Sequence, residues 1–343
     1  MGLKVAMVTS WMQKCGIFTY TQNLVHALAY LDVESYIVRL PRFGAKSSEL
    51  LQLVVDQVPV DKVDLIHVQY EGGLYQNLEG GFFGGLKRLG KPIVTTSHNV
   101  GNFLADSVIA NASDQVILHN EFCARHFSGP SVIIPHGCSP ADCPPSEECK
   151  RTLGIDPRVP IVGYCGFISE YKGLEVLFEA IVKVPKVAVL IGGGWFAGPG
   201  TAYMENLKQK SLAALPGRCQ WLGYVADEKL ATVYGSFDIL CYCSRFATES
   251  GALLMGLSHG KATIASALPP FKEKEKEGAL ITFKDVNDLR RKIKRVLKDA
   301  DLRHKLEEGA RKYAYENRWE VVAEKHINLY EEVIKRYGEK KKA

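Results

Sequence analysis

The sequence predicts an α/β protein of two doubly wound domains, in which strands and helices alternate. Short apolar runs of strand length are followed by segments whose apolar residues recur at helical spacing, a pattern typical of parallel sheets covered on both faces. A polar, proline-rich stretch at residues 139–160 interrupts the pattern, which then restarts. A length of 343 residues suits two domains. We expect the domains to face each other across a ligand cleft at the carboxyl ends of their strands.

The first half of the chain carries apolar runs that end in polar or glycine residues. The expected strands are residues 3–10, 34–40, 63–70, 91–98, 115–120 and 131–137. Residues 19–31 follow the first strand and form a helix with one apolar stripe. Gly72 and Gly73 predict a glycine-rich turn after the strand at 63–70.

The second half repeats the alternation and then ends in helices. The expected strands are residues 161–167, 186–193, 219–225, 237–243, 262–266 and 279–283. Residues 286–314 and 319–338 are expected to be helical. The alternating charges KEKEKE at 272–277 predict a solvated surface.

The composition is that of a globular protein with ample material for two cores. Apolar residues make up 46% of the chain, and the net charge of +5 is not concentrated in one block, which argues against a nucleic-acid partner. No apolar run reaches spanning length and the N-terminus lacks a signal-peptide pattern, so we expect a cytoplasmic protein. The basic C-terminal residues predict at most weak peripheral contact with anionic lipid at the inner membrane face.

Nine cysteines, an odd number in a chain without a signal peptide, favour a reducing compartment. A cluster at Cys138, Cys143 and Cys149 leaves two special interpretations open. Zinc binding is disfavoured because no CxxC pair occurs and no histidine has ligand spacing beside them. A disulfide between Cys143 and Cys149 would fit a hyperthermophilic source.

The most informative stretch for function is GYCGFISEYKG, residues 163–173. A buried strand is followed by Gly166, where the chain turns, and then by Lys172 at the mouth of a helix. Free N–H groups, the helix dipole and a lysine charge together suit a phosphate. A second loop before a helix, residues 245–261, repeats this chemistry with an arginine, a serine cap and a glycine. Two such helix starts indicate a diphosphate held between them.

In their order and spacing these motifs resemble the retaining glycosyltransferases of family 4 (glycosyltransferase group 1), which have two Rossmann-like domains of the GT-B type. The resemblance covers nearly the whole chain and is carried by the following segments: CGIFTYTQNLVHAL, DLIHVQYE, KPIVTTSHN, VIIPHG, GYCGFISEYKG, LIGGG, WLGYVADEKLATVYGSFDIL, SGALLMGLSHGKATIAS and NRWEVVAEKHINLYEEV. It implies an acceptor-binding domain at residues 1–143 and a donor-binding domain at 144–317. A C-terminal helix at 318–340 would pack back on the first domain.

The resemblance also implies roles for individual residues. Catalysis would depend on Lys172, Arg245 and His98. The donor would contact a larger set of residues: Gly16, Gly166, Tyr224, Val225, Glu249, Ser250, Gly251 and Ala252. Gln69 and Glu71 would face the acceptor, with Glu71 as a base for its hydroxyl.

Each of these residues also has an ordinary structural alternative. Lys172 would be a solvated lysine, although a cation at a helix start opposes the dipole. Arg245 would pair with Glu249 at the surface, or Glu249 would be a solvated loop acid. His98 would be a packed core histidine, and for His136 packing is at least as good an interpretation.

Two positions depart from the family pattern. Counting back from Gly260, the usual Glu-x7-Glu pair falls on Ala247 and Met255, with Glu249 two positions out of register. The arginine that often follows the glycine of the lysine motif is replaced by Phe167. Arg245, from the other loop, is the best local substitute.

The function expected from the resemblance is transfer of a sugar from a UDP- or GDP-sugar to an acceptor hydroxyl with retention. The acceptor would be a glycan, a lipid-linked molecule or a small molecule. No metal or other cofactor is expected to be obligatory, because no Asp-x-Asp motif lies in a suitable position. Three alternatives stay open: an epimerase or phosphorylase of the same fold, a non-catalytic nucleotide-sugar binding subunit, and a dinucleotide-dependent dehydrogenase. The last lacks GxGxxG after the first strand.

Overall fold

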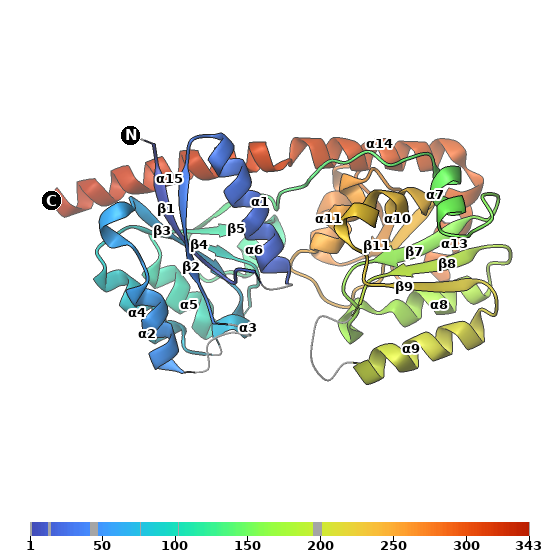
Figure 1. The fold of residues 1–343 in the computed structure, drawn as a ribbon, viewed down its shortest axis with the longest axis horizontal. Coiled ribbons are helices and arrows are strands. Elements are labelled where there is room, and N and C mark those ends of the chain that lie inside the picture. The colour runs from blue at the N-terminus through green and yellow to red at the C-terminus, as the bar shows by residue number, and fades with distance from the viewer. Residues whose placement is uncertain are drawn as a thin grey trace. The chain divides into compact units, whose positions relative to one another are not determined.

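The chain folds into two compact units, each built on one parallel sheet. The computed structural model describes residues 2–12, 15–41, 47–75, 77–101, 103–194 and 201–342. Unit 1 comprises Met1–Gly137 and Asn317–Ala343, and unit 2 comprises Cys138–Glu316. Figure 1 shows helices on both faces of each sheet. The predicted pair of doubly wound α/β sheets is confirmed.

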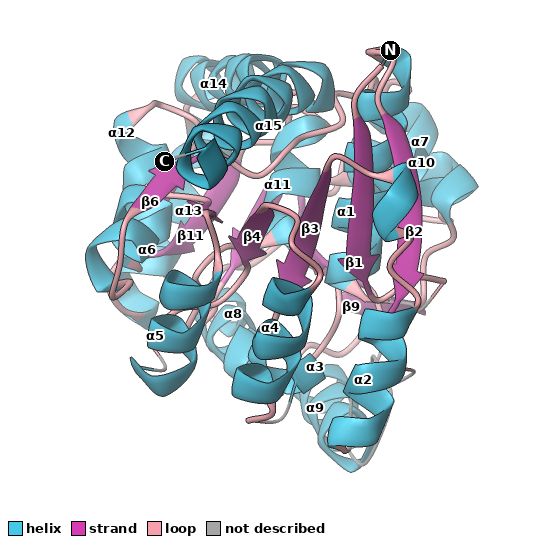
Figure 2. Cartoon of the chain, turned by 90° about the vertical axis from the view of Figure 1, so that its left-hand side faces the viewer, coloured by secondary structure: helices cyan, strands magenta, loops and turns pink. Residues whose placement is uncertain are grey.

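Unit 1 contains a six-stranded sheet in the order β2-β1-β3-β4-β5-β6, with every neighbouring pair parallel. Figure 2 shows β2, β1, β3 and β4 side by side in this order. The strands are β1 (Lys4–Thr9), β2 (Glu34–Arg39), β3 (Leu65–Tyr70), β4 (Ile93–Ser97), β5 (Gln115–Leu118) and β6 (Ser131–Ile133). The helices are α1 (Gly16–Tyr30), α2 (Ser48–Asp56), η1 (Val60–Lys62), α3 (Gly72–Tyr75), α4 (Glu79–Arg88), α5 (Phe103–Ala112), α6 (Glu121–His126) and α15 (Trp319–Lys342).

The strands of unit 1 bury both of their faces, which explains their nearly continuous apolar sequences. Along β1, Val5 and Met7 pack with α1 and α15, whereas Ala6 and Val8 pack with α2, α4 and α5. The chain enters unit 1 again at α15, which lies along it in Figure 1. This last helix therefore completes one layer of the first core. The glycine-rich turn expected after β3 is instead the short helix α3.

Unit 2 contains a second parallel six-stranded sheet, in the order β12-β11-β10-β7-β8-β9. Its strands are β7 (Ile161–Cys165), β8 (Ala188–Gly192), β9 (Cys219–Gly223), β10 (Ile239–Tyr242), β11 (Thr263–Ser266) and β12 (Ile281–Phe283). Its helices are α7 (Ser146–Thr152), η2 (Glu170–Lys172), α8 (Leu174–Val182), α9 (Thr201–Ala214), η3 (Asp227–Lys229), α10 (Leu230–Ser236), α11 (Gly251–Ser258), α12 (Pro269–Lys276), α13 (Val286–Lys298) and α14 (Ala300–Glu316). One continuous core joins these elements.

The attachment of α15 to the sheet of unit 1 includes buried polar contacts. The hydroxyl oxygen of Tyr330 on α15 lies 2.6 Å from His67 Nδ1, and His67 Nε2 lies 2.8 Å from the hydroxyl oxygen of Thr96. His326, one turn earlier on α15, is fully buried; its Nδ1 donates to the carbonyl of Val322 at 2.7 Å. Its Nε2 has no hydrogen-bond partner among the described residues. Burial lowers the pKa of His326 from 6.5 to about 4.

Acidification should therefore weaken unit 1 through His326. Because its pKa is lower in the folded state, the unfolded chain binds more protons between pH 6.5 and about 4, and stability falls as pH falls through that window. The loss attributable to this group is on the order of 3 kcal/mol. Denaturant unfolding from pH 7.5 to pH 4 should show a shallower pH dependence for His326→Leu than for wild type. The exposed His26→Leu serves as the control, and an unchanged slope in His326→Leu would contradict the assignment.

Candidate functional site

Each sheet has one point where the strand order reverses, and ligands of open parallel sheets bind at the carboxyl edge there. In unit 2 this point lies between β7 and β10, which are adjacent in the sheet although β8 and β9 separate them in sequence. In unit 1 it lies between β1 and β3. The residues predicted from sequence follow these strands. Lys172 and Arg245 come after β7 and β10, and Gly16 and Glu71 come after β1 and β3.

Lys172 is the most unusual side chain at the switch point of unit 2. It ends the short helix η2 and is only 8% exposed. Its ammonium lies 4.6 Å from the centre of the Tyr171 ring, and within the described residues it forms no ion pair with a carboxylate. A buried cation without a counter-charge lowers the stability of the fold unless a bound anion neutralises it. The observed burial does not fit the alternative of a solvated lysine.

Close backbone contacts hold this loop in place. Gly173 has a φ of 61°, and a Cβ there would lie 2.4 Å from the carbonyl oxygen of Cys243, so the loops after β7 and β10 touch backbone to backbone. The N–H of Arg245 donates to the carbonyl of Tyr171 at 2.7 Å and joins the same two loops. Gly166 has a φ of 151°, and a Cβ there would lie 2.7 Å from the Cβ of Ala252. Both glycines are needed for these approaches.

Arg245 lies beside this loop but has a partner that differs from the expected one. Its guanidinium pairs with Glu175 on α8, and Tyr203 on α9 donates to the same carboxylate at 3.2 Å. The Arg245 side chain is 59% exposed, so this pair contributes little stability and is readily exchanged. The expected structural alternative, a pair between Arg245 and Glu249, is wrong because Glu249 is engaged elsewhere. Arg245 is thus available to a phosphate near Lys172.

The start of α11 provides backbone donors at the same edge. Ser250 caps the helix by accepting from the N–H of Leu253 at 3.3 Å. The amides of Gly251 and Ala252 are the first of the helix and have no intrahelical acceptor. Tyr242, at the end of β10, donates to the carbonyl of Ala252 at 2.6 Å and fixes the helix start against the sheet. These amides are suited to an anion.

Glu249 stands next to the cap but is neither a solvated acid nor exposed. Its carboxylate lies 2.7 Å from Lys274 on α12, and the two side chains are 7% and 3% exposed. The other carboxylate oxygen accepts from the N–H of Ser250 at 2.8 Å. Burial lowers the pKa of Lys274, but the Glu249 carboxylate outweighs this and the net pKa is raised. Glu249 therefore anchors the loop before α11.

The buried pair corrects the expectation of a solvated surface at 272–277. Lys274 lies one turn after Phe271 on α12, and both side chains face the core. The ammonium of Lys274 also lies 5.7 Å from the ring centre of Tyr313. Charge alternation in the sequence does not reveal this, because a lysine is buried only when a distant acid is present to neutralise it.

Exposed aromatic rings surround the switch point of unit 2. Four large rings on the loops after β7, β9 and β10 are 36–58% exposed: Phe167, Tyr171, Tyr224 and Phe246. Val225 is half-buried and its side chain would meet a Cβ at Gly192 at 3.1 Å. Exposed aromatic groups clustered at one edge are typical of a ligand surface rather than of a protein core. Sequence reasoning had selected Tyr224 and Val225 but not Tyr171 or Phe246.

In unit 1, Gly16 begins α1 immediately after the loop that follows β1. Cys15 caps the helix, and its sulfur accepts from the N–H of Phe18 at 3.4 Å. Gly16 is exposed, and a Cβ there would meet no atom within 4 Å. The first turn of α1 is therefore accessible at the carboxyl edge of β1.

A row of polar side chains, with His98 half-buried between the buried Gln69 and His119, connects the ends of β3, β4 and β5. The Gln69 amide oxygen lies 2.9 Å from His98 Nε2, and His98 Nδ1 lies 3.3 Å from His119 Nε2. His119 Nδ1 then donates to the carbonyl of Ile134 at 3.1 Å. Burial, followed by the neighbouring histidines, lowers the pKa of His98 well below 6.5. His98 is therefore a neutral, oriented imidazole at neutral pH, and its two neighbours, Gln69 and His119, fix its ring.

The structure shows the surroundings of Gln69 and His136. Gln69 is fully buried among His67, His98 and Met7, so it supports His98 and does not face solvent. His136 packs between the rings of Tyr20 and Trp319, at centroid distances of 4.9 and 5.6 Å. The packing interpretation of His136 fits this geometry. The second histidine of the row, His119, was missed because a lone histidine after an apolar strand carries no signal of its own.

Glu71 lies at the end of β3 and accepts from the amide of Asn99 at 3.0 Å. Burial raises its pKa, although the backbone N–H groups of Gly73 and Leu74 oppose the shift. A carboxylate with a raised pKa is a stronger base. A small cavity of about 70 Å³ opens beside it, lined by Tyr70, Gly72, Asn99, Val100 and Asp106.

The described structure also bears on metal binding and on disulfide formation. In the described part of the chain, no three His, Cys, Asp or Glu side chains form a group that could hold a metal ion. All nine cysteines are free thiols, including Cys143 and Cys149. None of the helices in the described ranges is both long and apolar enough to cross a bilayer.

Comparison with solved structures defines the fold class. HepE from Anabaena, whose structure was determined with UDP and glucose, superposes with a TM-score of 0.80 at 15% identity, covering 96% of this chain and 100% of HepE. Sucrose-phosphate synthase from Thermosynechococcus elongatus superposes with a TM-score of 0.74 at 18% identity, covering 97% and 100%. The chain therefore has the GT-B fold.

The family follows from the sequence of unit 2. Residues 145–313 match the family model of glycosyl transferases group 1, and this domain belongs to that family. D-inositol 3-phosphate glycosyltransferase of Corynebacterium jeikeium is 27% identical over 216 residues, which are 59% of this chain and 51% of the relative. Sulfoquinovosyl transferase SQD2 of Arabidopsis thaliana is 26% identical over 53% of this chain and 36% of its own length. The chain spans about half the length, or less, of these curated relatives.

The pair between Glu249 and Lys274 should be essential for the loop before α11. Lys274→Met leaves a buried carboxylate without a partner and should cost about 3–5 kcal/mol of unfolding free energy. The double variant Glu249→Gln, Lys274→Met should recover most of this loss. Lys272→Met, an exposed lysine on the same helix, should change stability by less than about 0.5 kcal/mol. Denaturant titrations check this, and equal effects of Lys272→Met and Lys274→Met would contradict the buried pair.

Proposed function

We propose that this chain is a glycosyltransferase that moves a sugar from a nucleoside diphosphate sugar to an acceptor hydroxyl. The observation that carries the proposal is the buried ammonium of Lys172 at the switch point of unit 2, which forms no ion pair with any of the described residues. Arg245 and the free amides of Gly251 and Ala252 lie on loops of the same edge. The two phosphates of a nucleoside diphosphate carry the negative charge that would neutralise these positive groups.

The chemistry of such a site is stabilisation of the leaving group. As the bond between the anomeric carbon and the diphosphate breaks, negative charge grows on the phosphate oxygen, and the acceptor oxygen bonds to the same carbon. A fixed cation and helix-start amides favour this state more than the intact donor. No metal is needed to supply the positive charge, because Lys172 and Arg245 already provide it.

The donor is proposed to be a UDP-sugar, with a GDP-sugar as the alternative. The UDP-bound structures of HepE, a protein of the same fold, support a uridine nucleotide. The base would contact the loop of Tyr224 and Val225, and Gly166 would let the backbone approach the diphosphate. With Glu249 held by Lys274, we expect the loop before α11 to contact the nucleotide through its backbone rather than through this carboxylate.

Residues of unit 1 are proposed to contact the transferring sugar and the acceptor. His98, whose ring nitrogens contact Gln69 and His119, would lie beside the transferring sugar and would exchange the longer contact, with His119, for a sugar hydroxyl. Glu71, whose pKa is raised by burial, would take the proton of the acceptor hydroxyl. Gly16 would allow the start of α1 to approach the donor phosphate.

Retention of configuration is proposed from the family alone. The acceptor is proposed to be a glycan, a lipid-linked molecule or a small molecule; the relative from Corynebacterium jeikeium is named for a small molecule, D-inositol 3-phosphate. The cytoplasmic location and the weak contact with anionic lipid stay predictions, as do the domain boundaries at residues 143 and 317.

Lys172→Ala should reduce the rate of donor turnover by about 10²–10³-fold while the fold persists, because one transition-state cation is lost. The measurement is release of UDP from UDP-glucose with and without acceptor, together with UDP binding by calorimetry. Lys183→Ala, which removes a lysine just after α8, is the matched control and should keep wild-type turnover.

Wild-type turnover by Lys172→Ala would contradict the diphosphate role. Conversion of the donor sugar without acceptor and without UDP release would favour an epimerase. Tight UDP binding with no turnover of any donor would favour a binding subunit.

A further inference from the structure

A second polar cavity lies in unit 2, away from the carboxyl edge of the sheet. Its volume is about 270 Å³, and the following residues line it: Ala141, Asp142, Cys143, Pro144, Ser146, Gly235, His259, Lys261, Glu307 and Arg311. Lys261 precedes β11, and His259 follows α11, whose opposite end carries Gly251. The cavity therefore lies at the amino edge of the sheet and is distinct from the candidate site at Lys172.

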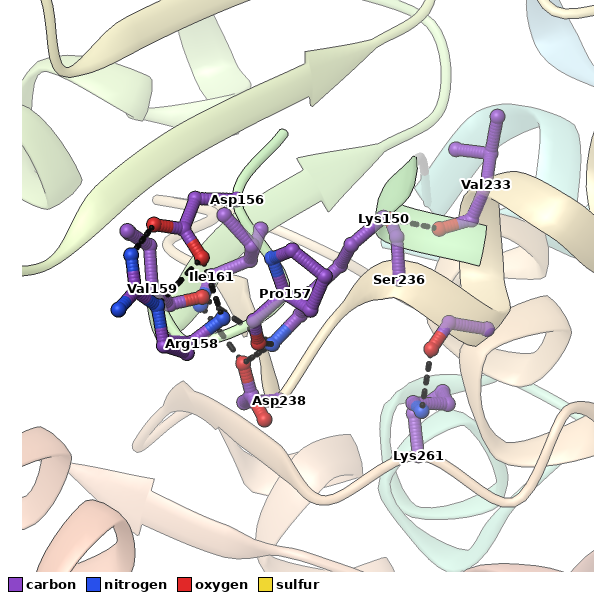
Figure 3. A network of polar contacts seen from close by, with 11 residues as sticks. Lys150, Asp156, Pro157, Arg158, Val159, Ile161, Val233, Ser236, Asp238 and Lys261 are labelled. Atoms are coloured by element: carbon purple, nitrogen blue, oxygen red, sulfur yellow. Dashed lines mark hydrogen bonds and ion pairs between the residues drawn. The ribbon is translucent and has the colours of Figure 1, made fainter. Parts of the chain in front are cut away.

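Two lysines near this cavity, the buried Lys150 and the half-buried Lys261, differ in their polar contacts, as Figure 3 shows. The Lys150 ammonium lies 2.8 Å from the carboxylate of Asp238 and 3.1 Å from the carbonyl of Val159. The Lys261 ammonium has one weak contact, 3.5 Å from the carbonyl of Gly235. Across the described ranges, no carboxylate lies within ion-pair distance of Lys261. Burial lowers the pKa of Lys261, and the charges of Glu307 and Asp238 oppose this shift without reversing it.

Other groups at the cavity are also suited to an anion. Arg311 on α14 lines it and, within the part of the chain that the structure describes, forms no ion pair. Ser146 at the start of α7 has a buried hydroxyl with no hydrogen-bond partner among the described residues. His259 donates through Nδ1 to the carbonyl of Met255 at 2.8 Å, which fixes its ring at the cavity wall.

We propose that this cavity binds a small oxyanion of the phosphate type, held by Lys261 and Arg311, with the hydroxyl of Ser146 as a further donor. An oxyanion would accept hydrogen bonds from the half-buried ammonium, the arginine and the hydroxyl together. The volume exceeds that of one phosphate group, so there is room for the body of a small phosphorylated molecule. Asp142 and Glu307, which also line the cavity, would accept hydrogen bonds from hydroxyl groups on that body.

The test is thermal unfolding of the full chain in a buffer free of phosphate and sulfate, titrated with inorganic phosphate. Lys261→Gln and Arg311→Gln should each weaken the phosphate-dependent shift by about tenfold or more in concentration, because each removes a charge-assisted contact. Lys305→Gln, which removes an exposed lysine from the same helix as Arg311, is the control and should keep the shift. Without phosphate, Lys261→Gln should unfold at a temperature no lower than that of wild type, because the ammonium that it removes has no carboxylate partner among the described residues.

Lys172→Ala separates this cavity from the site of the proposed transferase. A phosphate shift that persists in Lys172→Ala and is lost in Lys261→Gln and Arg311→Gln supports the cavity. A shift lost in Lys172→Ala alone places phosphate at the other site and overturns the proposal. Absence of any phosphate shift in wild type, or an unchanged shift in both cavity variants, overturns it as well. Because Arg311 is exposed, its variant should fold even if Lys261→Gln does not.

Discussion

The candidate site depends on one constraint, the close backbone contact of the loops that follow β7 and β10. Gly173 approaches the carbonyl of Cys243 so closely that no side chain fits between them. This contact brings residues about seventy positions apart to one edge of the sheet, next to Lys172, which forms no ion pair with a carboxylate within the described residues. The loop contact therefore fixes the position of the Lys172 ammonium, and a positive charge there favours an anionic ligand.

Four lysines of unit 2 that are buried or half-buried fall into two groups, according to whether a carboxylate lies beside the ammonium. Lys150 and Lys274 each lie within 2.8 Å of a carboxylate, and their role is structural. Among the described residues, the buried Lys172 and the half-buried Lys261 form no such pair, although removing an isolated charge from water is costly. Structural charges are neutralised inside the fold, whereas the two unpaired ones face the carboxyl edge and a polar cavity. We infer that anionic ligands neutralise Lys172 and Lys261.

The sequence was sufficient for the order of strands and helices and for the position of Lys172, because apolar runs, glycine turns and helical spacing are local signals. It did not predict that Gln69 is buried behind His98, or that Arg245 pairs with Glu175. These contacts join residues 29 and 70 positions apart in the sequence, and they arise only when the strands and helices have packed together. Lys274 was placed at the surface because alternating charges usually are solvated. Its burial depends on Glu249, 25 residues away.

The most direct test of the central claim is thermal unfolding of the full chain with UDP, GDP or ADP, each with and without magnesium. A ligand at a hundred times its dissociation constant adds about 2.7 kcal/mol, which is easily observed. We expect one nucleoside diphosphate to stabilise the protein equally with and without magnesium, since Lys172 and Arg245 supply the positive charge. Stabilisation by NAD alone, or by none of these nucleotides, would contradict a diphosphate site at the switch point of unit 2.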